Sequence, residues 1–201
     1  MADASWYVAV TGTGLEQGDL IADLPIPVTG GIQFDEGRPT RVSTRLEVVD
    51  ALVLTQSCDL VQGKVGEVMV CAVASWDALV EAELARGNTA VAGSSFIEKL
   101  IEGAIPSLSL LHRRSTRPEL PWSVANFRRL YTVERVYLHQ VLVDRRTVRR
   151  LRLRSPYREH LAQALARYFM RVGLPHDAAP FRIEGRDAAK AVAASLRPSP
   201  G

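Results

Sequence analysis

The sequence has little cysteine and no long apolar run. Its 201 residues include two cysteines, Cys58 and Cys71, too few for the disulfide framework of a small secreted protein. It lacks a Cys-x-x-Cys pair and any cluster of histidine and cysteine, so we expect neither a metal site nor a cofactor. No apolar stretch approaches the roughly 20 residues that cross a bilayer. The first residues also lack the basic start of a secretory signal. We therefore expect a cytoplasmic protein that does not enter the membrane.

The composition is otherwise that of a globular protein, with 47% hydrophobic and 23% charged residues. The length predicts one domain with elaborations. Charge is unevenly distributed, because residues 1–60 hold nine acidic and three basic side chains, whereas residues 128–171 hold twelve arginines and three acidic side chains. This polarity predicts a basic face for phosphates or for an acidic partner. Alternatively, the basic segment pairs with the chain's own acidic half.

The central motif is an apolar run that leads into a polar corner. Residues 48–54 read Val-Val-Asp-Ala-Leu-Val-Leu, the pattern of a strand largely buried on both faces. We expect a polar pocket where this strand leaves the core, formed by Thr55, Gln56, Ser57, Cys58 and Asp59. Cys58 is then a nucleophile, or the Gln56 amide and the Asp59 carboxylate form a recognition pair. The alternative is that Ser57 and Asp59 cap a turn while Cys58 packs as a small hydrophobe.

Further elements surround this strand. Apolar patterning predicts strands at 6–10, 18–25, 68–73 and 108–111. The alternation Leu151-Arg-Leu-Arg154 predicts a further strand with an arginine face. Three glycines and a proline predict an exposed loop over 28–40. Helical spacing predicts two helices, at 75–86 and 94–101, inserted between strands. Residues 127–143 alternate as one bent strand or a hairpin. Ser155 and Pro156 predict the start of a C-terminal helix that ends at Gly173.

Five short motifs occur in an order that is similar to that of one protein family. They are Gly18-Asp-Leu-Ile-Ala-Asp-Leu-Pro25, Leu52-Val-Leu-Thr-Gln-Ser-Cys-Asp59, Val68-Met-Val-Cys-Ala-Val-Ala-Ser75, Leu130-Tyr-Thr-Val-Glu134 and Leu153-Arg-Ser-Pro-Tyr157. In this order the chain resembles the MazF/PemK family of bacterial toxin folds, over less than half of its length.

The resemblance implies an α+β fold, a small SH3-like, half-open β-barrel with a helical insertion at about 76–126 and a C-terminal helix. The barrel domain then spans residues 1–174, and residues 175–201 form an extension. The resemblance also implies a homodimer and a toxin–antitoxin or phage-defence setting.

Two departures from the family bear on chemistry. Family ribonucleases usually carry an arginine just before the second strand, where this chain has Asp50 and Ala51. They place threonine or serine at the end of the third strand, where Ala74 stands here with Ser75 next to it. A carboxylate repels an anionic transition state. The resemblance therefore supports the fold better than the ribonuclease activity.

The first functional hypothesis is a nucleic-acid-binding barrel without catalysis, taking RNA or DNA. Its phosphate ligands would be the arginines of the basic segment, Arg145, Arg146, Arg149, Arg150, Arg152 and Arg154. The alternative for these residues is a solvated arginine face or a subunit interface. A purely structural protein that binds a protein partner or pairs as a homodimer also remains open.

Two enzymatic hypotheses use Cys58, Asp59 and Ser75 as catalytic candidates. In an endoribonuclease, Arg38 or Arg41 would replace the missing cation, Ser75 would orient the phosphate, and His112 or His139 would move protons. In a Cys58-dependent hydrolase or transferase, a base must lie near the thiol. Nothing in the sequence brings a histidine to it.

Overall fold

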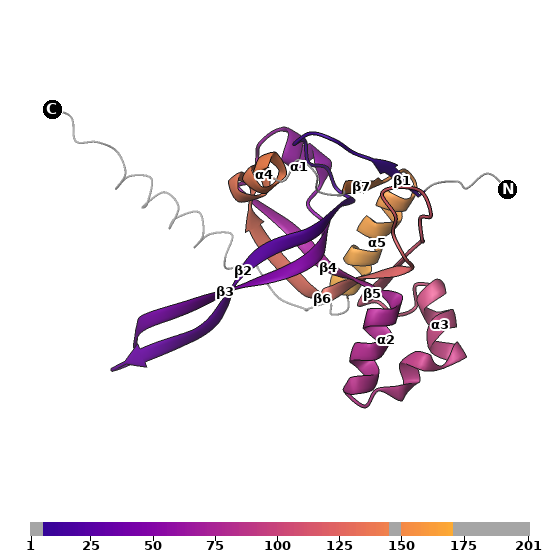
Figure 1. The fold of residues 1–201 in the computed structure, drawn as a ribbon, viewed down its shortest axis with the longest axis horizontal. Coiled ribbons are helices and arrows are strands. Elements are labelled where there is room, and N and C mark those ends of the chain that lie inside the picture. Colours follow the sequence, from indigo (N-terminus) through magenta and orange to yellow (C-terminus); the bar gives the residue numbers. More distant parts are fainter. Residues whose placement is uncertain (1–5, 145–149, 171–201) are drawn as a thin grey trace, which may run out of the picture. The chain divides into compact units, whose positions relative to one another are not determined.

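The computed structural model describes residues 6–144 and 150–170. These residues form an antiparallel sheet with five α-helices around it (Figure 1). The sheet has seven strands in the order β1-β7-β2-β3-β4-β6-β5. The predicted α+β class is confirmed, whereas the sheet is not closed into a barrel. No helix of the described ranges is long and apolar enough to cross a membrane.

The strands are β1 (Tyr7–Ala9), β2 (Asp19–Asp35), β3 (Arg38–Val53), β4 (Glu67–Ser75), β5 (Leu108–Leu111), β6 (Ser123–Glu134) and β7 (Arg150–Leu153). The α-helices are α1 (Ser57–Val61), α2 (Trp76–Ala85), α3 (Ser94–Ile101), α4 (Arg135–Asp144) and α5 (Tyr157–Phe169), and a 3-10 helix, η1, spans Thr89–Ala92. The described residues up to Phe169 form one compact unit. The expected extension at 175–201 lies outside the described residues.

Two hydrophobic cores lie on opposite faces of the sheet, and β3 contributes to both. Its side chains alternate, so Val49, Ala51 and Val53 enter one core while Leu52 enters the other. Helix α4 covers the first core through Leu138, Val141 and Leu142. Helix α5 covers the second through Leu161. The prediction that this strand is largely buried on both faces is confirmed for 49–53, whereas Val48 is exposed.

The predicted helical insertion is present after β4. Ser75 is the N-cap of α2, since its Oγ accepts a hydrogen bond from the Ala78 N–H at 3.2 Å. Helices α2 and α3 form a small core with the sheet through Leu79, Leu100 and Val124. The chain then returns as β5, which pairs with β6 at the edge of the sheet.

The prediction of an exposed loop over 28–40 is wrong. These residues form the outer half of a long β2–β3 hairpin, which projects from the rest of the unit in Figure 1. The turn uses positive φ angles at Glu36 (46°) and Gly37 (77°), as a tight hairpin requires. A register shift lies between Thr29 and Gly31, so two of the glycines that suggested a loop, Gly30 and Gly31, lie at a bulge, and the third, Gly37, lies in the turn.

The strand or hairpin predicted over 127–143 is correct only in its first half. Strand β6 ends at Glu134, and Arg135 begins α4. The buried residues of α4 are Leu138, Val141 and Leu142, spaced by three and one. This spacing places them on one helical face, and the helix buries all three against the sheet.

A buried ionic network joins the N-terminal segment to β7. Asp19, the first residue of β2, is fully buried. Its carboxylate accepts hydrogen bonds from Arg152 Nε at 2.5 Å and Nη2 at 3.0 Å. Arg150 Nε lies 3.6 Å from Asp19 Oδ2. Arg150 also donates to the carbonyl oxygens of Gly12 and Gly14, at 2.8 and 2.6 Å.

The network extends to α5 through a second carboxylate. Glu16 pairs with Arg152 and, at 3.4 Å, with Arg158 of α5. Burial lowers the pKa of Arg150, whereas the hydrogen bond to Asp19 raises the pKa of Arg152. For these arginines, the alternative that the basic segment pairs with the chain's own acidic half is confirmed.

Replacing Asp19 with asparagine is expected to destabilise the protein strongly. The substitution keeps the side-chain volume but leaves Arg150 buried at 3% exposure without its counter-charge, and loss of one partner of a buried pair costs about 3–5 kcal/mol. Urea unfolding measures the free energy. The control is Glu83→Gln, which removes the exposed pair with Arg86 and is expected to cost less than about 1 kcal/mol. Equal small losses in both variants would contradict the prediction.

Candidate functional site

The polar corner after β3 is used mainly to fix the backbone. Thr55 Oγ1 accepts a hydrogen bond from the Met69 N–H at 2.7 Å, and Ser57 Oγ accepts one from the Gln17 N–H at 3.1 Å. Gln17 in turn donates its side-chain amide to the Leu54 carbonyl. Thr55 and Ser57 therefore hold the chain as it leaves the sheet and enters α1. The capping alternative is correct only for Ser57, because the side chain of Asp59 lies beside the Cys58 thiol and Cys58 is exposed instead of packed as a small hydrophobe.

Cys58 is exposed at the start of α1. Its Sγ lies 3.6 Å from Gln56 Oε1 and 3.8 Å from Asp59 Oδ1. Reactive thiolates lie beside cations or a paired histidine, whereas both of these neighbours are hydrogen-bond acceptors. Cys71 is fully buried, and burial raises the pKa of its thiol to about 12. Both cysteines are free.

The catalytic candidates do not come together. Cys58 and Asp59 follow the end of β3 that lies beside Met69 on β4. Ser75 is six residues further along β4, on the order of 20 Å away at about 3.3 Å per residue. Its hydroxyl also caps α2. A site that combines Cys58, Asp59 and Ser75 is therefore excluded by the topology.

The arginine face expected on β7 is also not formed. Arg150 and Arg152 are held in the ionic network because β7 lies inside the sheet, between β1 and β2. Arg154 follows the strand and is exposed, and its backbone N–H donates to the Trp6 carbonyl. Arg145, Arg146 and Arg149 lie outside the described residues.

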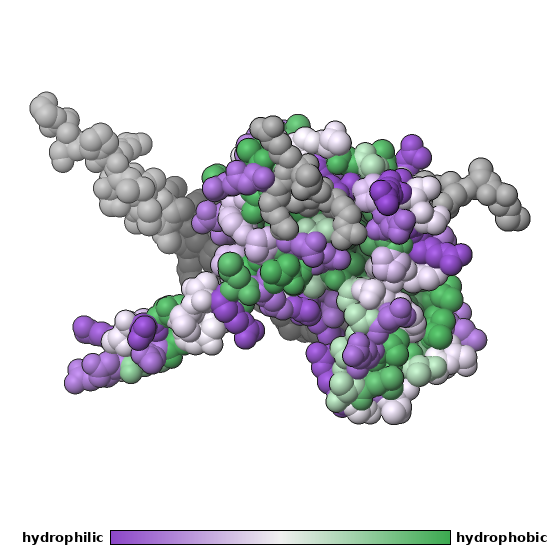
Figure 2. Space-filling model, viewed as in Figure 1, coloured by the Kyte–Doolittle hydropathy of each residue, from purple (hydrophilic) through white to green (hydrophobic). Residues whose placement is uncertain are grey.

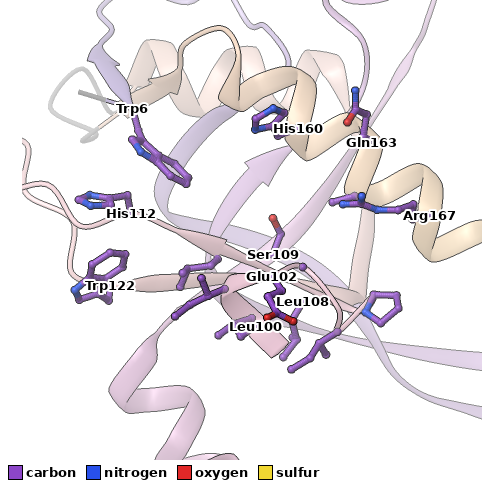
Figure 3. A pocket seen from close by; sticks show the side chains of 16 residues that line it. Trp6, Leu100, Glu102, Leu108, Ser109, His112, Trp122, His160, Gln163 and Arg167 are labelled. Carbon is purple, nitrogen blue, oxygen red and sulfur yellow. The ribbon is translucent and has the colours of Figure 1, made fainter. Parts of the chain in front are cut away.

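All three tryptophans of the chain line two neighbouring pockets. The first pocket, of about 600 Å³, is shown in Figure 3 and lies between α5, β5 and the end of α3. Trp6 and Trp122 line this pocket. The second pocket, of about 620 Å³, includes Trp76 and again Trp122. We call these two cavities, which share Trp122, the tryptophan pockets.

Aromatic rings in and beside the first pocket form a continuous series. Trp6 stacks on Tyr157 with ring centroids 4.1 Å apart and an interplanar angle of 12°. Trp6 also lies 5.5 Å from the His112 ring, which lies 4.4 Å from Trp122. Trp6 precedes β1, His112 follows β5, Trp122 precedes β6 and Tyr157 begins α5. The fold therefore gathers these rings from distant parts of the chain.

The polar side chains of this pocket come largely from one stripe of α5. His160, Gln163 and Arg167 are spaced by three and four residues and line the cavity in Figure 3. The Arg167 guanidinium lies close to Gly103, just after the end of α3. Its Nη2 would be 3.7 Å from a Cβ atom built on that glycine. Since cations are favoured at helix C-termini, this position suits the guanidinium. Glu102, Ser109 and His112 also contribute to the polar lining.

His112 has a defined orientation. Its Nδ1 lies 2.8 Å from the Arg113 carbonyl oxygen, which only accepts, so Nδ1 carries the proton and Nε2 of the neutral ring is an acceptor. The Tyr7 hydroxyl donates to the His112 carbonyl at 2.9 Å, and burial raises the pKa of Tyr7. The strand end that carries His112 is thus fixed to β1.

The second pocket has mixed charge. Arg113, Arg114, Asp77 and Glu119 line it together with Trp76, Ser115, Leu120 and Pro121. Arg114 Nε donates to the Pro118 carbonyl at 3.1 Å, and the backbones of Arg114 and Leu120 form an isolated bridge. The loop between β5 and β6 is therefore held closed, with Trp122 at its end.

Sequence reasoning identified His112 but missed the tryptophan pockets. A usable signal was present, because tryptophan is scarce in the chain and the α5 pattern has polar residues at positions 160, 163 and 167. Comparison of the chain with protein-family models, curated proteins and solved structures found no match.

The two cysteines are expected to differ sharply in reactivity. Iodoacetamide is expected to modify Cys58 in the folded protein, whereas Cys71 is expected to react only after unfolding because it is buried and remains a thiol near neutral pH. Mass spectrometry of timed samples measures one added group per chain. A Cys58→Ser variant serves as the control and is expected to remain unmodified. Equal labelling of both cysteines would contradict the assignment.

Proposed function

We propose that this protein binds single-stranded nucleic acid in the tryptophan pockets. The observation that carries the proposal is the gathering of all three tryptophans of the chain around two adjoining cavities. Proteins bind single strands by stacking bases on aromatic side chains, because every base has a flat π-face. Trp122 is 38% exposed, so part of the shared tryptophan is accessible to a ligand.

The polar groups around the rings suit the rest of a nucleotide. Arg167 and Arg113 are exposed cations for phosphate oxygens. Glu102, Gln163 and Ser109 offer acceptors and donors for the edge of a stacked base. A volume of about 600 Å³ lies in the range of small-ligand sites. The pockets therefore combine stacking, charge and hydrogen bonding.

A single strand suits this geometry better than a duplex. Bases in a duplex are stacked on one another, and their faces become available only when the strand is open. The described part of β7 offers no basic face for a duplex backbone, because Arg150 and Arg152 are held by Asp19. Binding through rings and a few cations is expected to tolerate different base sequences.

We also propose that the chain is related to the MazF/PemK family. This relationship would give the sheet a half-open, SH3-like barrel ancestry and the protein a role in a bacterial toxin–antitoxin or phage-defence system in the cytoplasm. Endoribonuclease activity is the second candidate, favoured by the position of His112 and His160 on one pocket. Cleavage of RNA needs one group that takes a proton and one that gives it.

Removing the shared ring is expected to weaken binding of single-stranded RNA. In a Trp122→Ala variant, the dissociation constant is expected to rise about 5- to 150-fold, equivalent to roughly 1–3 kcal/mol of lost stacking. Fluorescence anisotropy of a labelled oligonucleotide measures it. The control is Phe169→Ala, which removes an exposed aromatic ring that does not line either pocket. Equal affinities of wild type and Trp122→Ala would refute the proposal.

Removing one phosphate ligand is expected to change the salt dependence. In an Arg167→Ala variant, the slope of log affinity against log salt is expected to fall by about 0.7, the value for one contact with a single strand. Arg86→Ala, an exposed arginine paired with Glu83, is the matched control with an unchanged slope.

The same samples on a denaturing gel test for cleavage of the RNA. Cleavage that disappears in a His160→Ala variant would establish the ribonuclease. Binding of the RNA without cleavage would support the binding function and argue against the ribonuclease.

A further inference from the structure

The outer part of the β2–β3 hairpin, residues 25–48, is a two-stranded ribbon. We call it the arm. In the described residues, β4 pairs with β3 only over Asp50–Val53, and β7 pairs with β2 only over Asp19–Ile21. Figure 1 shows the arm extending away from the sheet and its helices. A two-stranded ribbon alone is marginally stable in water, so a formed arm of this length calls for a surface that covers it.

The two faces of the arm differ in chemistry. Val49, Ala51 and Val53 enter the core on one face, so by alternation Val48 and Leu46 lie on the other. The strand register adds their partners and continues this second face to the tip as an apolar face: Pro25, Pro27, Thr29, Ile32, Phe34, Pro39, Val42, Thr44, Leu46 and Val48. Figure 2 shows both hydrophilic and hydrophobic residues along the arm.

The opposite face of the arm is polar beyond its base. Residues Arg45, Ser43 and Arg41 alternate with the apolar ones on β3, and Gln33 faces Arg41 across the ribbon. The apolar side chains are strongly exposed, at 48% for Ile32, 63% for Phe34, 57% for Val42, 68% for Leu46 and 62% for Val48. A contiguous exposed apolar surface of this kind marks an interaction site.

The apolar face is nearly symmetric about its centre. Thr29 pairs with Thr44 there. On β3, Leu46 lies two residues from Thr44 toward the base of the arm, and Val42 lies two residues from it toward the tip. On β2, Pro27 lies on the basal side of Thr29 and Ile32 on the distal side. The order along the face is therefore large, small, large from base to tip. A two-fold rotation about this centre places the large apolar side chains of one copy against those of the other, so the same patch covers itself, as in an isologous interface.

We infer that the arm is a homodimer interface, in which the apolar faces of two arms pack on each other about a two-fold axis near Thr44. In this arrangement Leu46 and Pro27 of one copy pack on Val42 and Ile32 of the other. The arm carries three arginines and three acidic residues, so no net charge opposes the contact. A specific interface needs on the order of 1,000 Å² of buried surface, and the apolar face offers side chains along both strands from the base of the arm to its tip. This inference does not depend on the tryptophan pockets.

The test compares substitutions on adjacent residues of one strand. Sedimentation equilibrium of the full chain is expected to show a dimer. Val42→Lys and Leu46→Lys are expected to raise its dissociation constant at least about tenfold, since they place a charge in the contact. Ser43→Lys adds the same charge to the polar face and is expected to leave the dimer intact. A wild-type monomer up to high micromolar concentration, or a dimer unaffected by both apolar-face variants, overturns the inference.

Cross-linking provides a readout that does not depend on a disruptive variant. In a Cys58→Ser background, Thr44→Cys is expected to form a covalent dimer with a short bismaleimide, because the two thiols lie near the axis. Ser43→Cys, on the opposite face, is the control and is expected to stay uncoupled. Equal cross-linking of the two cysteine variants overturns the inference. A monomer whose apolar face instead takes up RNA, shown by weaker binding in Val42→Lys, also overturns it.

Discussion

The arrangement of this protein depends on the burial of one carboxylate, that of Asp19. It brings the first residue of β2 together with Arg150 and Arg152 of β7 across more than half of the chain. Strand β7 in turn pairs with β1, and the Arg154 N–H that follows it binds the Trp6 carbonyl. The same network reaches α5 through Glu16 and Arg158. This ionic contact therefore positions two parts of the first tryptophan pocket, Trp6 near the start of the unit and helix α5 at its end.

The residues that stabilise the fold therefore differ from those proposed to bind the ligand. The charged residues that seemed suited to bind a ligand hold the scaffold, whereas the proposed ligand surface is built mainly of rings. Arg150 is buried with its guanidinium directed at the carbonyl oxygens of Gly12 and Gly14, so it replaces the hydrogen bonds that a regular strand would give that segment. The glycine-containing segment before β2 is thereby held in place without a strand of its own.

How far the sequence predicts the structure differs from element to element. The strand at 48–54 was predictable because its composition allows one interpretation, and the Ser155–Pro156 start of α5 followed from local chemistry. The direction of Arg150 and Arg152 was not, because it depends on a carboxylate more than 130 residues away. The arm was missed because glycine and proline signal loops, whereas the pairing of Thr29 with Thr44 is a property of two strands together. The tryptophan pockets were missed for the same reason, since Trp6, Trp122 and His160 meet only in the folded chain.

The three prolines of the arm have a consequence for how it associates. A proline within a ladder occupies a position whose missing N–H would point away from the partner strand. Pro25 and Pro27 on β2 therefore remove two donors from one outer edge of the ribbon, and Pro39 on β3 removes one from the other. An edge interrupted by prolines is a poorer template for a further strand, which disfavours growth of the sheet into fibrils. The prolines thus oppose assembly along the edges of the arm, whereas the apolar face proposed as the dimer interface carries no such obstacle.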